Sequence, residues 1–217
     1  NKNGYSWTLS YWRAKWFGRR LISGGQRYGV IAGTVKKSDI IAVLLGRGEM
    51  EIAVDPYKVY DKVSMPKKRP KAFQDVLDVT LSVYSLGMSS VHGLDHWEKV
   101  EHNAIELAKN TPGADLVVCR LFALIHDCKR ANEDSDPQHG PSAAKIAKTL
   151  WDNGVISIYR SQLDKLMYAC EKHDNGLVSN DPTIGCCWDA DRLDLMRVGI
   201  HPDPELLSTA YGKSHVW

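Results

Sequence analysis

A chain of 217 residues, 43% hydrophobic and 25% charged, has room for one ordinary domain with an appendage or for two small domains. The composition is typical of a soluble globular protein, and no run approaches the ~20 apolar residues that cross a bilayer, so no membrane partner is expected. The net charge of +2 hides a division, because residues 1–72 contain 15 Lys and Arg against 5 Asp and Glu, whereas residues 73–217 contain 13 against 21. Such a split suggests two modules with different functions.

The basic front half is predicted to contain β structure. Residues 28–32, 40–45 and 51–54 are strand-like, and a turn at residues 46–48 favours a hairpin between the second and third strands. Ahead of them, aromatic and basic side chains are interleaved: Trp7, Tyr11, Trp12, Trp16 and Phe17 with Arg13, Lys15, Arg19 and Arg20. These side chains could bind nucleic acid by base stacking and phosphate contacts, or the aromatic residues could form a small core of their own. Residues 1–65 are interpreted as a small basic β-rich module of unknown function.

The rest of the chain has helical periodicity. Residues 66–71, charged and containing Pro66 and Pro70, have the composition of a linker. Beyond them apolar residues recur at helical spacing, and residues 116–125 form an almost continuously apolar helix. Helix starts are expected at Pro141, at a possible capping box of Ser161 and Asp164, near Trp188 and near Pro204. The predicted fold class is therefore mostly α, with a helical domain over residues 72–217.

Ionisable residues fall at informative points of these helices. His126 and Asp127 close the most apolar segment, residues 121–125, where burying two polar side chains is costly unless a partner is present. A divalent metal is such a partner, because imidazole and carboxylate are its ordinary ligands. His96 precedes one apolar helix face, His173 ends another, and Asp191 lies within residues 188–194. Four separate helices can thus direct ligands to one central point, as helical bundles do when they bind metals.

Three motifs in this order resemble the HD superfamily of metal-dependent phosphohydrolases. The segment His96-Trp97-Glu98-Lys99-Val100 looks like the first-ligand helix, Leu124-Ile125-His126-Asp127 contains the doublet that names the family, and Ala190-Asp191-Arg192-Leu193-Asp194 is similar to its closing motif. The resemblance covers about residues 90–200 and is absent from residues 1–72. It implies an HD-type helical bundle with metal bound by His96, His126, Asp127 and Asp191. Catalysis would then depend on His126 and Asp127, the latter as ligand and proton acceptor.

Further residues extend this interpretation. Some HD proteins have histidines at points similar to His139 and His173 and bind a second metal with Asp127 as the bridge. Each of these histidines could bind metal or substrate phosphate, or it could cap a helix. His92, one turn before His96, is a candidate for substrate contact. Lys129 and Arg130 could also bind substrate phosphate, or they could cover a solvent-facing helix end.

Other acidic residues are expected to support the ligands, and the ligand set and the cysteines indicate which metals and which redox environment suit the protein. Asp95 and Asp189 are expected to orient neighbouring ligands, and Asp194 to cap a helix or form a salt bridge. The ligand set accepts Mn, Fe, Co, Ni or Zn, with Mg possible, as one or two ions. The five cysteines form no C-x-x-C pair and favour a reducing cytoplasm, with Cys186 and Cys187 in packing positions.

The leading functional hypothesis is metal-dependent hydrolysis of a phosphate ester or anhydride by a metal-activated water. The substrate is expected to be a nucleotide or a related small phosphorylated metabolite. One alternative is a di-iron oxygenase on the same scaffold, with His139 and His173 completing the site. The other is a nucleic-acid-binding protein in which the basic N-terminal module sets the function and the helical domain acts on a nucleic-acid end. Whether the protein forms an oligomer is left open.

Overall fold

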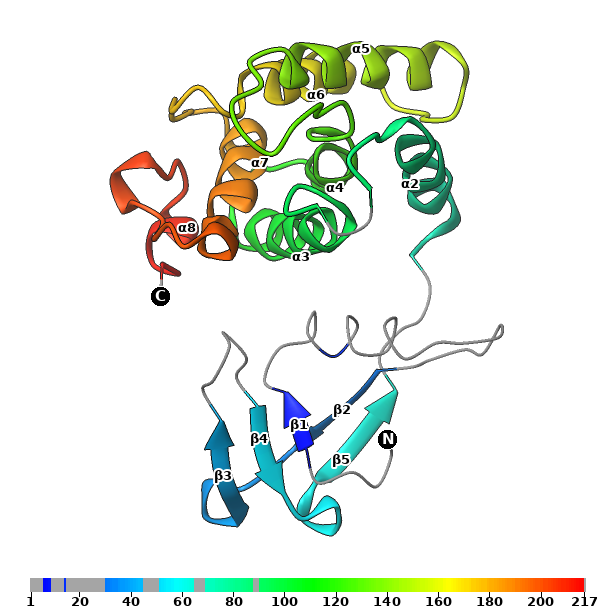
Figure 1. The fold of residues 1–217 in the computed structure, drawn as a ribbon. Helices are drawn as coiled ribbons and strands as arrows, with labels where there is room; N and C mark the ends of the chain where they lie inside the picture. The colour runs from blue at the N-terminus through cyan, green and yellow to red at the C-terminus, as the bar shows by residue number, and fades with distance from the viewer. Residues whose placement is uncertain are drawn as a thin grey trace. The chain divides into compact units, whose positions relative to one another are not determined.

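The computed structural model describes residues 6–8, 14, 30–44, 51–64, 69–87 and 90–216. It divides the chain into two compact units, Asn1–Arg69 and Pro70–Trp217. The first unit contains the strands and the second contains the long helices (Figure 1). A mostly helical fold with a small N-terminal β module was predicted from the sequence, and the structure confirms it.

The first unit contains two small antiparallel sheets. β1 (Ser6–Thr8), β4 (Glu51–Val54) and β3 (Ile40–Leu44) form one sheet in that order, and β2 (Ile31–Thr34) pairs with β5 (Tyr60–Ser64). Side chains alternate across the strands, so that Ile52 and Val54 are buried whereas Ile41 and Val43 are exposed. The strands therefore have one inner and one outer face.

The structure agrees with some of the strand bounds predicted for this unit and corrects others. The first was predicted to end at residue 32, but β2 continues to Thr34 because Thr34 pairs with Tyr60 of β5, a strand that was not predicted individually. The third agrees with β4, and β3 covers residues 40–44 of the second, whose last predicted residue lies outside the described residues. The predicted turn at residues 46–48 lies outside the described residues, as do Tyr11, Trp12, Trp16 and Phe17.

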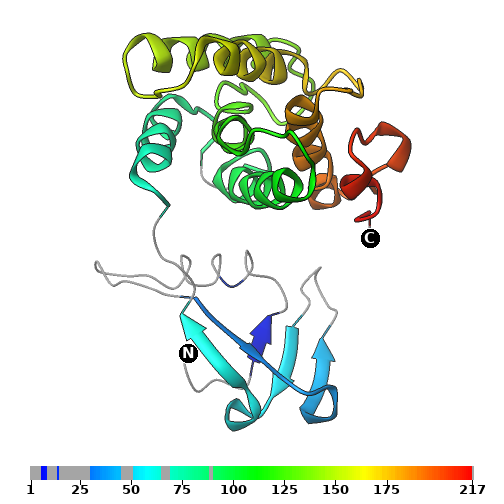
Figure 2. The same cartoon turned by 180° about the vertical axis from the view of Figure 1, so that it is seen from behind.

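The second unit is a bundle of helices. Its elements, in chain order, are α2 (Lys71–Val83), α3 (Leu94–Asn110), α4 (Leu116–Ile125), α5 (His139–Asp152), α6 (Arg160–Lys172), α7 (Pro182–Arg192), η4 (Leu195–Val198), η5 (Pro204–Leu206) and α8 (Ala210–Lys213). α4 lies at the centre, in contact with α2, α3, α5, α6 and α7, and this arrangement is visible from both sides (Figures 1 and 2). Because neighbours surround it, α4 is apolar on nearly every face.

Several helix starts differ from the sequence-based expectation. α5 begins at His139, two residues before Pro141, and α7 begins at Pro182, capped by Asp181, rather than near Trp188. α6 begins at Arg160, where the Gln162 side chain accepts a hydrogen bond from Tyr159 N at 2.8 Å. The proposed box of Ser161 and Asp164 is therefore wrong, since Asp164 instead pairs with Arg160 at 2.8 Å. The helix predicted near Pro204 is only the 3-10 helix η5, and the next helix, α8, begins at Ala210.

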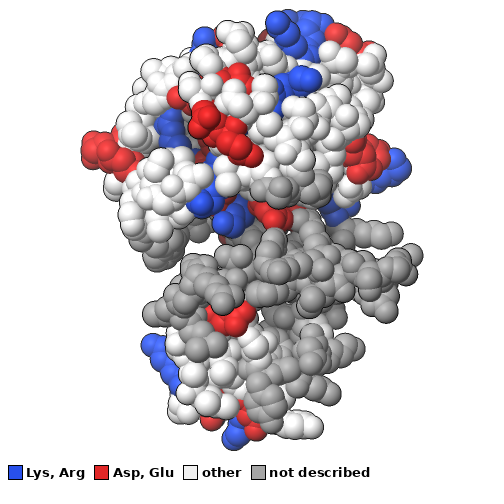
Figure 3. Space-filling model, viewed as in Figure 1, with Lys and Arg blue, Asp and Glu red and all other residues white. Residues whose placement is uncertain are grey.

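The surface and core of the helical unit are ordinary for a folded domain. All five cysteines are buried and unpaired, and Cys186 and Cys187 pack in the main hydrophobic core, as expected. Acidic and basic side chains are interspersed on the face of this unit seen in Figure 3. Within the described ranges, no helix combines the length and the apolar character needed to cross a membrane.

Candidate metal centre

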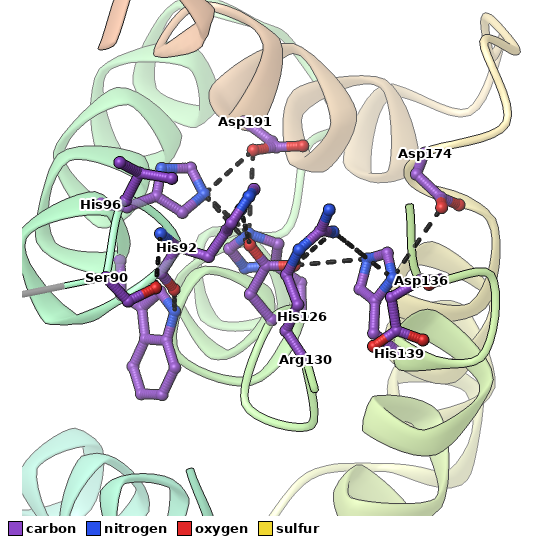
Figure 4. Close-up of polar contacts among 12 residues, drawn as sticks. Ser90, His92, His96, His126, Arg130, Asp136, His139, Asp174 and Asp191 are labelled. Carbon is purple, nitrogen blue, oxygen red and sulfur yellow. Dashed lines mark hydrogen bonds and ion pairs between the residues drawn. The ribbon is translucent and has the colours of Figure 1, made fainter. Parts of the chain in front are cut away.

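Six ionisable side chains meet inside the helical unit, and most of them are drawn in Figure 4. α3 supplies His96, His126 and Asp127 directly follow α4, α5 begins with His139, His173 directly follows α6, and α7 supplies Asp191. The side chain of Asp191 is 16% exposed, and the other five are at most 3% exposed. Segments up to 95 residues apart in the sequence are therefore joined by buried polar contacts.

His96, His126, Asp127 and Asp191 form what we term the first cluster. The Nε2 atoms of His96 and His126 are 3.1 Å apart. Asp191 Oδ1 is 3.2 Å from His96 Nε2 and 3.7 Å from His126 Nε2. Asp127 Oδ2 is 3.6 Å from each of these nitrogens. The four residues predicted as ligands are thus brought together.

Asp127, His139 and His173 form the second cluster. The Nε2 atoms of His139 and His173 are 2.9 Å apart. Asp127 Oδ1 is 3.3 Å from His139 Nε2 and 3.6 Å from His173 Nε2, yet it has no hydrogen-bond partner among the described residues. Because Oδ2 of the same carboxylate faces the first cluster, Asp127 lies between the two and is shared by them.

The outer ring nitrogens fix the orientation of all four histidines. Each Nδ1 faces an oxygen atom: the carbonyls of Phe122, Asp136 and Cys170 for His126, His139 and His173, and the carboxylate of Asp194 for His96. Since these oxygens accept hydrogen bonds, each Nδ1 carries the proton, and in a neutral ring Nε2 has only its lone pair. The Nε2 atoms of His96 and His126 therefore face each other, and so do those of His139 and His173. Both pairs lie beside carboxylates. This donor set fits a divalent cation, with the outer oxygens holding the ligands in place.

Without a metal, protons occupy part of this donor set. Burial lowers the pKa of His126 to about 3. Burial also acts to lower the pKa of His173, but the contact with Asp127 and the charge of Asp191 outweigh it and raise that pKa to about 9. The pKa of His96 is likewise raised, because hydrogen bonds to Asp191 and Asp194 outweigh burial. In each facing pair, one histidine thus has a raised pKa and holds a second proton, at Nε2, more readily than a free imidazole does, and a bound cation would displace that proton.

The two carboxylates of the clusters are held in the ionised form. Burial by itself would raise the pKa of Asp127, but the nearby His126, His173 and His92 hold it well below its ordinary value. For Asp191, His96 and His126 have the same effect and lower the pKa strongly against burial. Ionised carboxylates are the form that binds divalent cations.

Two neighbouring acids differ in what they contact. Asp194 forms the expected salt bridge, with Oδ1 3.0 Å from Lys99 Nζ. Asp189 was expected to orient a ligand, and this is wrong. Its carboxylate accepts hydrogen bonds from Ser208 N at 2.7 Å and from Thr209 N at 2.8 Å, and so holds the segment that leads into α8. The reason is helical geometry, because residues two apart, such as Asp189 and Asp191, point to different faces of a helix.

The candidate substrate residues lie at different distances from the clusters. Arg130 Nη1 is 3.9 Å from Asp127 Oδ1 and 3.3 Å from His139 Nε2, whereas Lys129 is exposed. His92 Nδ1 is 3.2 Å from Asp127 Oδ2. Arg197 in η4, with Nη2 3.2 Å from His92 Nδ1, was missed by the sequence reasoning. A basic residue one turn after Asp194 was the signal that could have found it.

Of three comparisons with known proteins, one found a match. No protein-family model matches the chain, and no curated protein matches it. A solved structure, described as a predicted HD superfamily hydrolase from an uncultured Thermotogales bacterium, is 25% identical and has a TM-score of 0.50. The match covers 65% of this chain and 80% of that chain. The helical unit has an HD-type fold.

The HD resemblance seen in the sequence is thereby confirmed. In the HD domain, as we now call residues 70–217, the three motifs occupy α3, the end of α4 and the end of α7. These are the places where the first cluster is built. Together, the similarity and the His/Asp clusters support a metal-dependent hydrolase as the general class of protein.

Proposed function

We propose that the HD domain hydrolyses a phosphate ester or anhydride, in a nucleotide or a related small phosphorylated metabolite. The observation that carries this proposal is the double set of facing Nε2 atoms around Asp127, at 3.1 Å and 2.9 Å. Such a site binds one or two of Mn, Fe, Co, Ni or Zn, with Mg also possible. When bound, a divalent cation supplies a Lewis acid that polarises the phosphoryl group and activates a water molecule.

The chain's own residues supply the other requirements of phosphoryl transfer. The resemblance to the HD superfamily gives Asp127 the role of taking up the proton lost by the attacking water, and the neighbouring histidines keep its carboxylate ionised for binding a cation. Arg130, next to the second cluster, can donate to an oxygen of the phosphoryl group and offset its charge. Its Nε is buried without a partner among the described residues, whereas Nη2 is held by the Asp134 carbonyl at 2.7 Å. Burial of the clusters limits access of bulk water.

The test is a metal analysis followed by a phosphatase screen. The full chain is purified, its metals are measured, and phosphate release from nucleotides and simple phosphoesters is followed with Mn or Co and with a chelator. We expect metal-dependent release that Asp127→Ala abolishes. Asp164→Ala, which removes an exposed carboxylate on α6, should release phosphate like the natural chain. A folded, metal-loaded sample that hydrolysed no phosphoester or anhydride would refute the proposal.

A di-iron oxygenase is the second candidate. The specific observation in its favour is that His139 and His173 complete a six-residue set around the shared Asp127. This function would require about two iron ions per chain and consumption of oxygen together with an organic substrate. Anaerobic release of phosphate would instead favour the hydrolase, and a single bound ion would exclude the oxygenase.

A further inference from the structure

His92 and Arg197 make an unusual contact beside the first cluster. Arg197 Nη2 lies 3.2 Å from His92 Nδ1, and the same Nδ1 lies 3.2 Å from Asp127 Oδ2. A ring nitrogen that carries a proton donates to the carboxylate, and one that has a lone pair accepts from the guanidinium. It cannot do both. One of these two contacts therefore lacks a proper hydrogen bond in the absence of another molecule.

Arg197 is fixed so that only one end of its guanidinium faces this position. Nε donates to the Val91 carbonyl at 2.9 Å, and Nη1 donates to the Asp194 carbonyl at 3.2 Å. Nη1 also lies 3.8 Å from Asp194 Oδ2. These contacts leave Nη2 as the end directed to His92. A guanidinium anchored in this way loses little conformational entropy when it binds an anion.

The pair is more exposed than His96 and Asp127 beside it. The side chains of His92 and Arg197 are each 12% exposed, whereas that of His96 is fully buried and that of Asp127 is 3% exposed. An incoming molecule can therefore reach the pair and the shared carboxylate together. The side chain of Arg130 is 13% exposed and lies near Asp127 Oδ1, and that of His92 lies near Asp127 Oδ2. A guanidinium and an imidazole thus flank the shared carboxylate, one near each of its oxygens.

We propose that Arg197 and His92 form an anion-binding pair that takes an oxygen of the substrate's phosphoryl group. An oxygen placed beside both residues would accept from Arg197 Nη2, so that His92 Nδ1 is left to its contact with Asp127 Oδ2 and the conflict at Nδ1 is resolved. The inference rests on the proposed function, because the phosphoryl group is assigned to the neighbouring clusters. It adds Arg197, in η4, to the residues that contact substrate.

The test measures phosphate binding separately from catalysis. Full-length protein is loaded with manganese, freed of excess metal, and titrated with inorganic phosphate by calorimetry. Arg197→Gln should weaken phosphate binding by about 10-fold or more, with metal content unchanged, as expected for loss of a charge-assisted hydrogen bond. Arg197→Lys should retain part of the affinity. Arg160→Gln removes an exposed arginine of α6 and should bind phosphate like the natural chain.

Three results would overturn the pair as an anion site. The first is unchanged phosphate affinity in Arg197→Gln, and the second is loss of metal and of thermal stability in both Arg197 variants, which would indicate a structural role. Absence of any phosphate binding by the natural, metal-loaded chain would count equally against it. If phosphate binds through Arg197 but no phosphoester or anhydride is hydrolysed, the anion site stands and the proposed function fails.

Discussion

Asp194 contacts the ring nitrogen of His96 that faces away from the first cluster. Its Oδ2 lies 2.8 Å from Nδ1 of the imidazole, although the two residues are 98 positions apart in the chain. The contact sets which ring nitrogen faces the first cluster. Oδ1 of the same carboxylate is bound by Lys99. The closing motif of the HD domain therefore contributes both a cluster residue, Asp191, and the residue that orients His96.

Replacing Asp194 with Asn should weaken metal binding without unfolding the protein. Residues that orient a metal-binding histidine typically affect metal affinity about 10- to 100-fold, because ring orientation and basicity both change. The measurement is competition for Mn or Zn with a chelating dye, with circular dichroism as the test of folding. Asp203→Asn, in the cap of η5, is the matched control. Equal affinity in both variants would contradict the assigned role.

Removal of single histidines should reveal how many ions the clusters hold. We expect the natural chain to bind two ions and His173→Gln to bind about one, because the second cluster then retains only Asp127 and His139. His96→Gln should affect the first cluster in the same way. Elemental analysis after desalting gives the stoichiometry, and His201→Gln, at an exposed position, serves as the control. A single ion in the natural chain would show that the clusters act as one site.

The metal-free protein should lose stability as the pH rises. The pKa of His173 is raised from 6.5 to about 9, so the folded state holds this proton more tightly than the unfolded state does. The stabilisation is therefore fully present below pH 6.5 and is lost as the pH rises through about 9. Thermal melts in chelator should show a falling Tm across this window. His173→Gln should flatten the curve, and a natural chain with constant Tm there would refute the expectation.

Below this window the opposite trend is expected. The pKa of His126 is lowered from 6.5 to about 3, so the unfolded state takes up a proton that the folded state resists. Stability should therefore also fall as the pH drops from 6.5 towards 3. The two effects together place the optimum of the metal-free form near pH 6.5.

Gly140→Ala should damage the second cluster through packing. A Cβ at Gly140 would lie 2.7 Å from the Cys170 carbonyl oxygen and 3.1 Å from that of Glu171, both in the backbone of α6. The Cys170 carbonyl also receives the hydrogen bond of His173 Nδ1. We expect a loss of about 1–3 kcal/mol in the free energy of unfolding, as for other overpacked sites, and reduced metal content. Ser142→Ala, in the same helical turn, is the control for thermal and chemical unfolding.

The sequence by itself determined the class of the fold and the main ligand candidates. A period of 3.6 residues reports which face of a helix is buried, and an apolar α4 followed directly by His126 and Asp127 leaves those side chains inside the domain. Such features are local, so they can be read from neighbouring residues. The motifs around His96 and Asp191 added the order in which the ligand candidates follow along the chain.

Only the tertiary structure decided which remote residues meet. Helical spacing fixes the face on which a side chain lies, but the crossing of helices sets the distance between residues as far apart as His96 and Asp194. For this reason sequence reasoning left His139 and His173 open between binding and capping, misassigned Asp189, and did not single out Arg197. The facing Nε2 atoms arise from the packing of α3, α4, α5 and α6, which no single segment of the chain encodes.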